Sequence, residues 1–392
     1  MTPVAQQTRL VAERLRERNR VSAAFFPHES ERLAKACQEM AARFLRGGRL
    51  LAFGRDQYAT DAQHVSVEFV HPVIVGKRAL PALDLSLSYR GWLAAILRPE
   101  DMVMGFGPPE GDPEVAAALR SARARGAQTF ALPGSEGDYA VEAPSPDPYI
   151  HQEIVEILYH TLWETVHVFF EHRELGHDVG QSGFLYPFLG RQKQDTSGVL
   201  GQAAASIRTK AEDDERLREE VAEREAERIV QAALTMRERV QAGGKLILFG
   251  NGGSATDAND WALDCALPLK PFSPIPAVSL AMEPANVTAV ANDVGAEAIF
   301  LRQLIALAEP QDVAVGISTS GGSANIVAAL EEARKRGLLT VALLGYDGGE
   351  VLRRGLADFP LVVRCDYIPR IQEVQASIYH VLLEVLAEAA GG

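Results

Sequence analysis

An internal duplication is the feature that most constrains how this chain of 392 residues can fold. The segment 47–69 begins GGRLLAFG, and the segment 243–265, which starts 196 positions later, begins GGKLILFG. A second pair of segments, 93–134 and 304–345, repeats at an offset of 211, with RPEDMVMGF in one and EPQDVAVGI in the other. Self-similarity at a fixed spacing predicts that one structural unit occurs twice.

Each copy alternates short apolar runs with segments of helical periodicity. This alternation predicts a parallel sheet covered by helices. We therefore expect an α/β protein of two tandem, doubly wound parallel-sheet domains with flanking helices. The domains are expected at residues 1–175 and 202–392, joined by a linker at 176–201.

The segments outside the sheets are expected to be mostly helical. Residues 5–20 and 30–46 carry apolar residues at helical spacing and predict two helices, separated near Pro27. The charged stretch 202–242 occupies the matching place before the second copy and predicts a helix with a solvated face. The linker is rich in glycine and polar residues, and we expect its apolar stretch Phe184–Leu189 to dock on a domain.

Composition argues against several classes of function. A formal net charge of −13 disfavours sequence-independent binding to nucleic acid, which requires a dense positive surface. The polar N-terminal segment lacks the apolar core of a signal peptide, and no apolar run approaches a membrane span in length. Cys37, Cys265 and Cys365 match no metal-binding spacing and are typical of a reducing compartment. We therefore expect a cytoplasmic protein without nucleic-acid or membrane partners.

Two glycine-rich turns in the C-terminal copy predict a phosphate site. Gly250–Ser254, with the sequence GNGGS, and Ser318–Asn325, with the sequence STSGGSAN, each follow an apolar run and precede a helical segment. The free N–H groups and the positive dipole end of a helix start favour an anion, and the hydroxyls of the second turn add donors. Neither turn fits the Walker or the dinucleotide pattern, so a sugar phosphate is favoured over a nucleotide.

The N-terminal copy has lost both turns. Gly54–Tyr58, with the sequence GRDQY, stands where the first turn would be, and Gly107–Pro113, with the sequence GPPEGDP, replaces the second. The carboxylates of Asp56 and Glu110 would repel a phosphate. We therefore expect the phosphate site in the C-terminal copy.

The C-terminal copy resembles the sugar isomerase (SIS) domain family. The shared motifs, which extend over residues 205–392, are GNGGS, STSGGSAN, RIQE at Arg370–Glu373, and Asn292-Asp293 in a loop that the N-terminal copy lacks. Within the family, the chain is most similar to the phosphoheptose (sedoheptulose 7-phosphate) isomerases. The resemblance implies that ten residues bind the substrate. They are Asn251, Gly252, Gly253, Ser254, Asp293, Ser318, Thr319, Ser320, Ser323 and Gln372.

The resemblance also implies four positions for chemistry. Phosphoheptose isomerases use a histidine, a glutamate, a glutamine and a second histidine, in this order, as metal ligands and as the acid and base. The N-terminal copy matches all four, with His64, Glu68, Gln152 and His160. The C-terminal copy has Asp260, Asp264, Gln372 and His380 at the same positions.

The N-terminal set suits aldose–ketose isomerisation, which needs a base over a carbon, an acid at the carbonyl oxygen and a group that stabilises the oxyanion. Glu68 suits the base, and His160 suits the acid because an imidazole titrates near working pH. His64, Glu68, Gln152 and His160 would hold a divalent cation, for which zinc is the first choice.

The losses in the two copies are complementary, so they predict a composite site. The acid, base and metal set is complete in one copy, and the phosphate turns are intact in the other. The resemblance implies active sites at subunit interfaces. We therefore expect the copies to act as two divergent subunits about a pseudo-twofold axis, within a homodimer of four domains. The expected reaction converts sedoheptulose 7-phosphate to a heptose 7-phosphate through an enediol.

Two alternatives stay open. Asp264 and His380 could act as base and acid beside the phosphate turns of their own copy, although aspartate reaches less far than glutamate. The chain could also be a noncatalytic SIS protein, either a sugar-phosphate sensor or a partner of the replication initiator, but the complete N-terminal set favours an enzyme. An amino-sugar isomerase of the tandem-SIS type would not be expected to carry GNGGS or RIQE.

Overall fold

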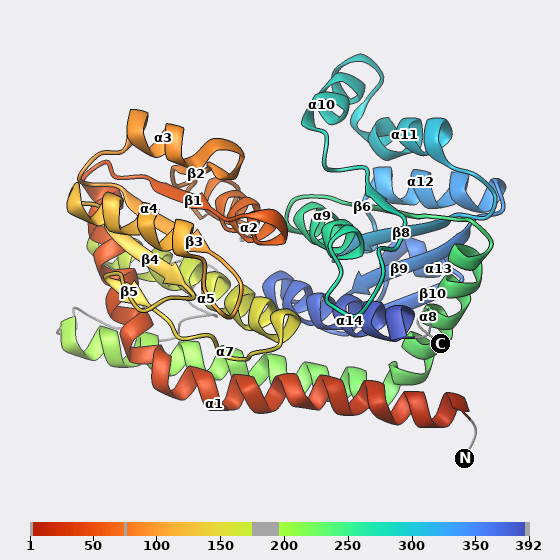
Figure 1. Cartoon of the computed structure of the whole chain (residues 1–392), viewed down its shortest axis with the longest axis horizontal. Coiled ribbons are helices and arrows are strands. Elements are labelled where there is room, and N and C mark those ends of the chain that lie inside the picture. Colours follow the sequence, from red (N-terminus) through yellow and green to blue (C-terminus); the bar gives the residue numbers. More distant parts are fainter. Residues whose placement is uncertain (1–2, 74–76, 175–195, 389–392) are drawn as a thin grey trace. The chain divides into compact units, whose positions relative to one another are not determined.

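The chain folds into two compact units, which are described here one at a time. The computed structural model describes residues 3–73, 77–174 and 196–388 (Figure 1). The N-terminal unit comprises Arg20–Asp213, and the C-terminal unit comprises Met1–Asn19 together with Asp214–Gly392.

The N-terminal unit is built on a five-stranded parallel sheet with the strand order β2-β1-β3-β4-β5. The strands are β1 (Leu50–Phe53), β2 (Ala82–Asp84), β3 (Met102–Phe106), β4 (Gln128–Leu132) and β5 (Tyr139–Ala140). The helices that follow strands are α2 (Ala59–Val70), α3 (Tyr89–Ile96), α4 (Pro113–Ala124) and α5 (Pro148–Glu174). Successive side chains of a strand point to opposite faces, so Leu50 packs in one core with α2 and α5, and Leu51 packs in another with α3 and α4.

The C-terminal unit is built on a second five-stranded parallel sheet, with the order β10-β9-β8-β6-β7. The strands are β6 (Leu246–Gly250), β7 (Ala277–Ser279), β8 (Val313–Ser318), β9 (Leu339–Gly345) and β10 (Phe359–Val363). The helices are α8 (Ala226–Gln241), α9 (Gly253–Ala266), α10 (Pro284–Asp293), α11 (Ile299–Leu307), α12 (Ala324–Lys335), α13 (Gly349–Arg353) and α14 (Ile368–Glu388).

The two sheets have the same topology, which confirms the predicted duplication and the α/β fold. Each begins with a strand that lies second in the sheet, and the remaining strands follow in the same order. The register repeats as well, since Leu50 of β1 pairs with Met102 of β3, and Leu246 of β6 pairs with Val313 of β8. These pairs are related by the offsets of 196 and 211 found in the sequence.

A single long helix, α1 (Pro3–Leu45), replaces the two leading helices that the sequence predicts. It runs unbroken through Pro27, where a backbone hydrogen bond is lost at a cost of about 3 kcal/mol. Its apolar face continues on both sides of the proline, because Phe26 and Leu33 are buried in the same core. The predicted break was wrong because packing of this face offsets the local cost.

Two further expectations need correction. The helix α7 (Thr196–Arg224) begins inside the predicted linker, and the rest of that linker, with Phe184–Leu189, lies outside the described residues. Asn292 and Asp293, expected in a loop, form the last turn of α10, which starts at Pro284 behind the capping side chain of Glu283. A proline at the first helical position and a capping carboxylate both favour a helix start, and they explain this difference.

The two longest described helices, α1 and α7, are rich in charged residues. α1 contains the run AERLRERNR, and α7 contains the run AEDDERLREE. Within residues 3–73, 77–174 and 196–388, no helix is both long enough and apolar enough to cross a membrane.

The leading helices are exchanged between the two copies. In the C-terminal unit, Nε of Arg14 on α1 lies 3.2 Å from Oε2 of Glu384 on α14. In the N-terminal unit, Lys210 on α7 pairs with Glu164 on α5. Lys210 follows Arg14 by 196 positions and Glu384 follows Glu164 by 220, so the two ion pairs are equivalent. The first turns of each copy's leading helix therefore belong to the unit built on the other copy's sheet.

We predict that Arg14→Met lowers the free energy of unfolding by about 2 kcal/mol, because it removes a cation from a Glu384 side chain that is only 14% exposed. Arg16→Met is the matched control on the same helix. Arg16 pairs with Glu219, and both side chains are about 40% exposed, so the expected loss is below about 1 kcal/mol. Urea unfolding measures both, and a loss below about 1 kcal/mol for Arg14→Met would show that the exchanged contact stabilises the unit no more than an exposed ion pair does.

Candidate functional site

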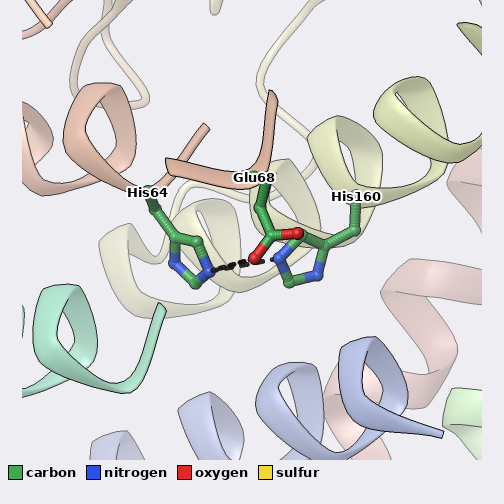
Figure 2. A group of neighbouring side chains, drawn as sticks. All are labelled: His64, Glu68 and His160. Atoms are coloured by element: carbon green, nitrogen blue, oxygen red, sulfur yellow. Dashed lines mark hydrogen bonds and ion pairs between the residues drawn. The ribbon is translucent and has the colours of Figure 1, made fainter. Parts of the chain in front are cut away.

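The first candidate site lies between α2 and α5 of the N-terminal unit, where three ionisable side chains point toward one another (Figure 2). α2 presents His64 and Glu68 on one face because they are four residues apart, and α5 contributes His160. Nε2 of His160 lies 3.2 Å from Nε2 of His64, which lies 3.9 Å from Oε1 of Glu68. All three side chains are buried. We call them the His–Glu–His cluster.

Gln152, the fourth residue of the predicted set, lies two helical turns before His160 on α5. Its Nε2 donates to Oδ2 of Asp61 at 3.1 Å and to Oγ1 of Thr60 at 3.5 Å. The structure therefore brings three of the four predicted residues into one cluster and holds Gln152 at the first turn of α2.

Burial governs the charge of the His–Glu–His cluster. It raises the pKa of Glu68 to about 8, and the nearby carboxylate of Glu164 adds to the rise. The short distance between the Nε2 atoms of His64 and His160 means that one ring donates and the other accepts, because two facing N–H groups would repel. The cluster thus combines a carboxyl group that titrates near neutral pH with an imidazole pair that shares one proton between its facing nitrogens.

The donor set of the His–Glu–His cluster fits a divalent cation. One ligand atom each from His64, Glu68 and His160 lies within 4.8 Å of the others. Oε2 of Glu68 is buried and has no hydrogen-bond partner among the described residues. Imidazole nitrogens and carboxylate oxygens are common ligands of zinc. Three protein ligands of this kind are typical of catalytic zinc sites, which keep a further position open.

A second cluster occupies the equivalent place between α9 and α14 of the C-terminal unit. Nε2 of His380 lies 3.5 Å from Oδ2 of Asp260 and 3.4 Å from Oδ2 of Asp264. The hydroxyl of Tyr379 donates to Oδ2 of Asp260 at 2.8 Å. Burial raises the pKa of Asp264 to about 7, and the negative charge of Asp260 adds to the rise. We call Asp260, Asp264 and His380 the Asp–Asp–His cluster.

The two glycine-rich turns of the C-terminal unit meet through a pair of amides. Nδ2 of Asn251 donates to Oδ1 of Asn325 at 3.0 Å, and Nδ2 of Asn325 donates to Oδ1 of Asn251 at 2.8 Å. α9 begins at Gly253 and α12 begins at Ala324, and neither helix carries a side-chain cap. The amides of both helix starts are thus left without an acceptor from the N-cap side chain, and free amides at a helix start favour an anion.

Backbone and hydroxyl geometry shape the same turns. Gly252 has a φ of +58°, a left-handed conformation that glycine adopts at little cost. Oγ of Ser318 accepts from the N–H of Gly321 at 3.1 Å and lies 3.5 Å from Oγ of Ser323. Oγ of Ser320, which is exposed, accepts from the N–H of Gly322 at 3.2 Å. The hydroxyl hydrogen of Ser320 therefore stays available to an anion, as does one of the two hydrogens in the Ser318–Ser323 pair.

The remaining predicted substrate residues differ in their surroundings. Ser254 is buried in the first turn of α9, and Thr319 is half-buried beside Ser318. Gln372 is buried on α14, and its Oε1 has no hydrogen-bond partner in the described part of the chain. Asp293 is exposed at the end of α10, where it accepts from Nδ2 of Asn292 at 2.7 Å.

In the N-terminal unit, an ion pair replaces the amide pair. Arg55 and Glu114 stand at the positions of Asn251 and Asn325, and Nη1 of Arg55 lies 3.4 Å from Oε2 of Glu114. Sequence reasoning did not assign a role to Asn325. The sequence held a signal for this contact, because Asn251 and Asn325 are both replaced by charged residues in the N-terminal copy.

The rest of the N-terminal turns is also closed to an anion. Asp112 supplies its own carboxylate to the start of α4, where Oδ1 accepts from the N–H of Glu114 at 2.7 Å. Nε2 of His151 donates to the carbonyl of Gly107 at 3.1 Å, and burial lowers the pKa of this histidine to about 4, so it stays neutral. Asp56 keeps a positive φ of +53° at the place of a glycine. These contacts support the expectation of a phosphate site in the other copy.

Comparison with known proteins places the sequence similarity in the C-terminal half. The SIS domain family matches residues 211–345. The phosphoheptose isomerase of Trichlorobacter lovleyi is 39% identical over 165 residues, which make up 42% of this chain and 83% of that protein. The phosphoheptose isomerase of Geobacter sulfurreducens is 43% identical over 169 residues, which make up 43% of this chain and 88% of that protein.

Solved structures share the fold over nearly the whole chain. The C-terminal domain of glucosamine-fructose-6-phosphate aminotransferase from Francisella tularensis has a TM-score of 0.52 and 12% identity, and the match covers 97% of this chain and 96% of that one. A candidate phosphosugar isomerase from Silicibacter pomeroyi DSS-3 has a TM-score of 0.57 and 14% identity, with 97% and 98% covered. At these identities the likeness shows the fold alone, a tandem pair of parallel-sheet domains.

We predict that Ser320→Ala raises the KM for a sugar phosphate about tenfold, because it removes one hydroxyl donor from the phosphate turn. Thr235→Ala is the control, since this exposed hydroxyl on α8 binds only the carbonyl of Gln231 in its own helix. Steady-state kinetics measure both variants. An unchanged KM for Ser320→Ala would count against the phosphate site.

We predict that Glu68→Gln stabilises the metal-free protein, and that the gain grows with pH. The pKa of Glu68 is about 8 in the folded state and near 4.5 in the unfolded state. The stability that depends on a protonated Glu68 is therefore fully present below pH 4.5, and it is lost as the pH rises to 8. Glutamine does not ionise and avoids this loss. Melting temperatures of both proteins with chelator at pH 5, 6.5 and 8 measure the gain, and a difference that is constant with pH would contradict the raised pKa.

Proposed function

We propose that this chain, which belongs to the SIS-domain family and is related through its C-terminal half to phosphoheptose isomerases, is an aldose–ketose isomerase of sugar phosphates. The observation that carries the proposal is the buried convergence of His64, Glu68 and His160. The reaction shifts hydrogen between adjacent carbons of one molecule. It neither gains nor loses electrons overall, so the protein is an isomerase and not an oxidoreductase.

In the proposed reaction, Glu68 takes the proton from the carbon next to the carbonyl group, and the electron pair of that C–H bond forms the enediol double bond. His160 gives a proton to the carbonyl oxygen. Glu68 then returns its proton to the neighbouring carbon while the other hydroxyl gives its proton to His160, which restores both residues and completes the shift. A base that titrates near 8 and an imidazole held by a second ring suit these two roles.

Burial of the cluster further supports the proposal. Its three side chains are buried, so a developing oxyanion beside them would feel nearby dipoles in a medium of low dielectric. A divalent cation held by His64 and its neighbours would polarise the carbonyl group when bound.

The phosphate turns would position the substrate. Ser254, Ser318, Ser320 and Ser323 supply hydroxyls, and the uncapped starts of α9 and α12 supply amides. Binding at a group remote from the reacting carbons holds the sugar in place and lowers the entropic part of the barrier. We propose sedoheptulose 7-phosphate as the substrate, because the relatives named phosphoheptose isomerase share the segment that holds both turns.

We further propose a division of labour between the copies, with acid–base chemistry from the N-terminal copy and phosphate binding from the C-terminal copy. This rests on the complementary losses, since each copy retains only one of the two sets. The alternative is that Asp264 and His380 act beside the turns of their own copy. A noncatalytic role as a sugar-phosphate sensor or replication-initiator partner is the second alternative, which a lack of turnover would favour.

We predict that Glu68→Gln lowers kcat by a factor of about 100 to 10,000 and leaves phosphate binding intact, because the shape is kept and the base is lost. Asp264→Asn, the matched change in the other copy, is expected to lower kcat less than about tenfold. An assay with sedoheptulose 7-phosphate, with and without chelator, measures turnover.

The ranking of the two variants decides between the alternatives. A larger effect of Asp264→Asn would show that the C-terminal copy works alone. No turnover of the wild-type protein would favour the binding protein, provided that calorimetry still detects the sugar phosphate.

A further inference from the structure

The segment that joins the last two strands of each sheet is shorter in the N-terminal copy. The same hydrogen bond anchors it in both copies. The N–H of Thr129 donates to Oδ2 of Asp138 at 2.9 Å, and the two residues are nine positions apart. The N–H of Thr340 donates to Oδ2 of Asp358 at 2.9 Å, and these two are eighteen positions apart. The nine additional residues lie between β9 and β10, where α13 forms, whereas residues 133–138 contain no helix.

In the C-terminal unit, α13 covers the start of α12. Val351 of α13 is fully buried and packs in one core with Ile326 and Leu330 of α12. Arg354, which follows the last residue of α13, pairs with Glu331 of α12. This short segment therefore places one apolar side chain and one cation on α12.

The N-terminal unit has a cavity at the corresponding place. Its volume is about 470 Å³, and its lining includes Val115 and Leu119 of α4. These two residues stand at the positions of Ile326 and Leu330, at the offset of 211. The cavity therefore lies where α13 lies in the other copy, and its size is common among ligand pockets. We call it the α4 cavity.

The lining of the α4 cavity is acidic. Four of its side chains carry carboxylates, and they are Glu110, Asp112, Glu136 and Glu142. Nη1 of Arg55 lies 2.9 Å from Oδ2 of Asp112 and offsets its charge. Arg120, the one cationic residue of the lining, lies with its Nη1 3.3 Å from Oε2 of Glu136. Two carboxylates remain.

Glu110 and Glu142 supply negative charge that no side chain offsets. Both residues are exposed, and neither carboxylate forms a hydrogen bond or an ion pair within the described part of the chain. The α4 cavity thus combines an apolar floor with a negative rim. Such a surface complements a segment that carries both an apolar residue and a cation.

We propose that the α4 cavity docks a short segment of a partner protein, which presents a branched apolar residue and, three positions later, an arginine or lysine. Val351 and Arg354 follow this pattern in the segment that covers α12. The apolar side chain of the partner packs on the floor of the cavity, and its cation faces Glu110 and Glu142. Docking of this kind takes affinity from the apolar contact and selectivity from the charges.

A capped, fluorescently labelled peptide with the sequence of residues 348–356, GGEVLRRGL, is the probe that tests this proposal. Fluorescence anisotropy with the full chain should show saturable binding with a dissociation constant below about 1 mM. The peptide GGEVLEEGL, in which glutamates replace both arginines, should bind at least about tenfold more weakly. In the protein, the double change Glu110→Gln and Glu142→Gln should weaken binding of the first peptide at least about fivefold.

Glu100→Gln is the matched control, because this exposed glutamate precedes β3 and does not line the α4 cavity. It should leave peptide binding unchanged. Ala116→Trp tests the shape of the site, since it adds a large side chain to the lining and should abolish binding. Both rim glutamates are exposed, so their glutamine variants are expected to fold, which circular dichroism checks.

Absence of saturable binding up to about 5 mM peptide would overturn the proposal. Equal binding by the wild type and the double glutamine variant, or by the wild type and Ala116→Trp, would overturn it as well. If Ala116→Trp does not fold, the double glutamine variant decides. Displacement of the peptide by spermidine at constant ionic strength would show that charge alone is recognised, which also contradicts a docked segment. No activity is measured, so the outcome is independent of the proposed reaction.

Discussion

The chemistry of each unit depends on one contact, in which the helix after the first strand of the sheet packs against the last helix of the same copy. α2 meets α5 in this way, and α9 meets α14. Side chains one turn apart on the first helix face the second helix, so two ionisable residues are held against a third in a buried position. Charges in this setting act on one another far more strongly than at a surface. The shifted pKa values of Glu68 and Asp264 both follow from it.

The comparison of the two copies shows how one scaffold has diverged. At the carboxyl edge of the C-terminal sheet, neutral amides of Asn251 and Asn325 join two turns whose helix starts are uncapped. At the same edge of the N-terminal sheet, Arg55 and Asp112 join and cap the turns with charges from the protein itself. The helix starts of the first arrangement have no side-chain cap, whereas the second arrangement supplies its own carboxylate. The strand-turn-helix path is the same in both copies, but the turns are joined by neutral amides in one copy and by charged side chains in the other.

Much of the fold and part of the site could be predicted from the sequence. The duplication, the parallel sheets and the convergence of His64, Glu68 and His160 follow from periodicity, from an offset kept over many residues and from motifs of a known family. Gln152 shows a limit of this reasoning. Its spacing from His160 on α5 can be read from the sequence, but its hydrogen bond with Asp61 depends on how α5 packs on α2. Pro27 shows another limit, since a local breaker is overridden by the apolar face around it. Contacts between distant segments decide both cases, and local patterns do not report them.

The exchanged helices have a consequence for the order in which the protein is made. Arg14 hydrogen-bonds with Glu388, which is 374 positions later in the chain. Val11 and Leu15, on the same helix, are fully buried in the finished protein. During synthesis this helix leaves the ribosome first, and Arg14 meets Glu388 only after both sheets have been made. A chain that stops short of α14 leaves Arg14 without Glu384 and Glu388, so its first helix lacks the ion pairs that join the two ends of the chain.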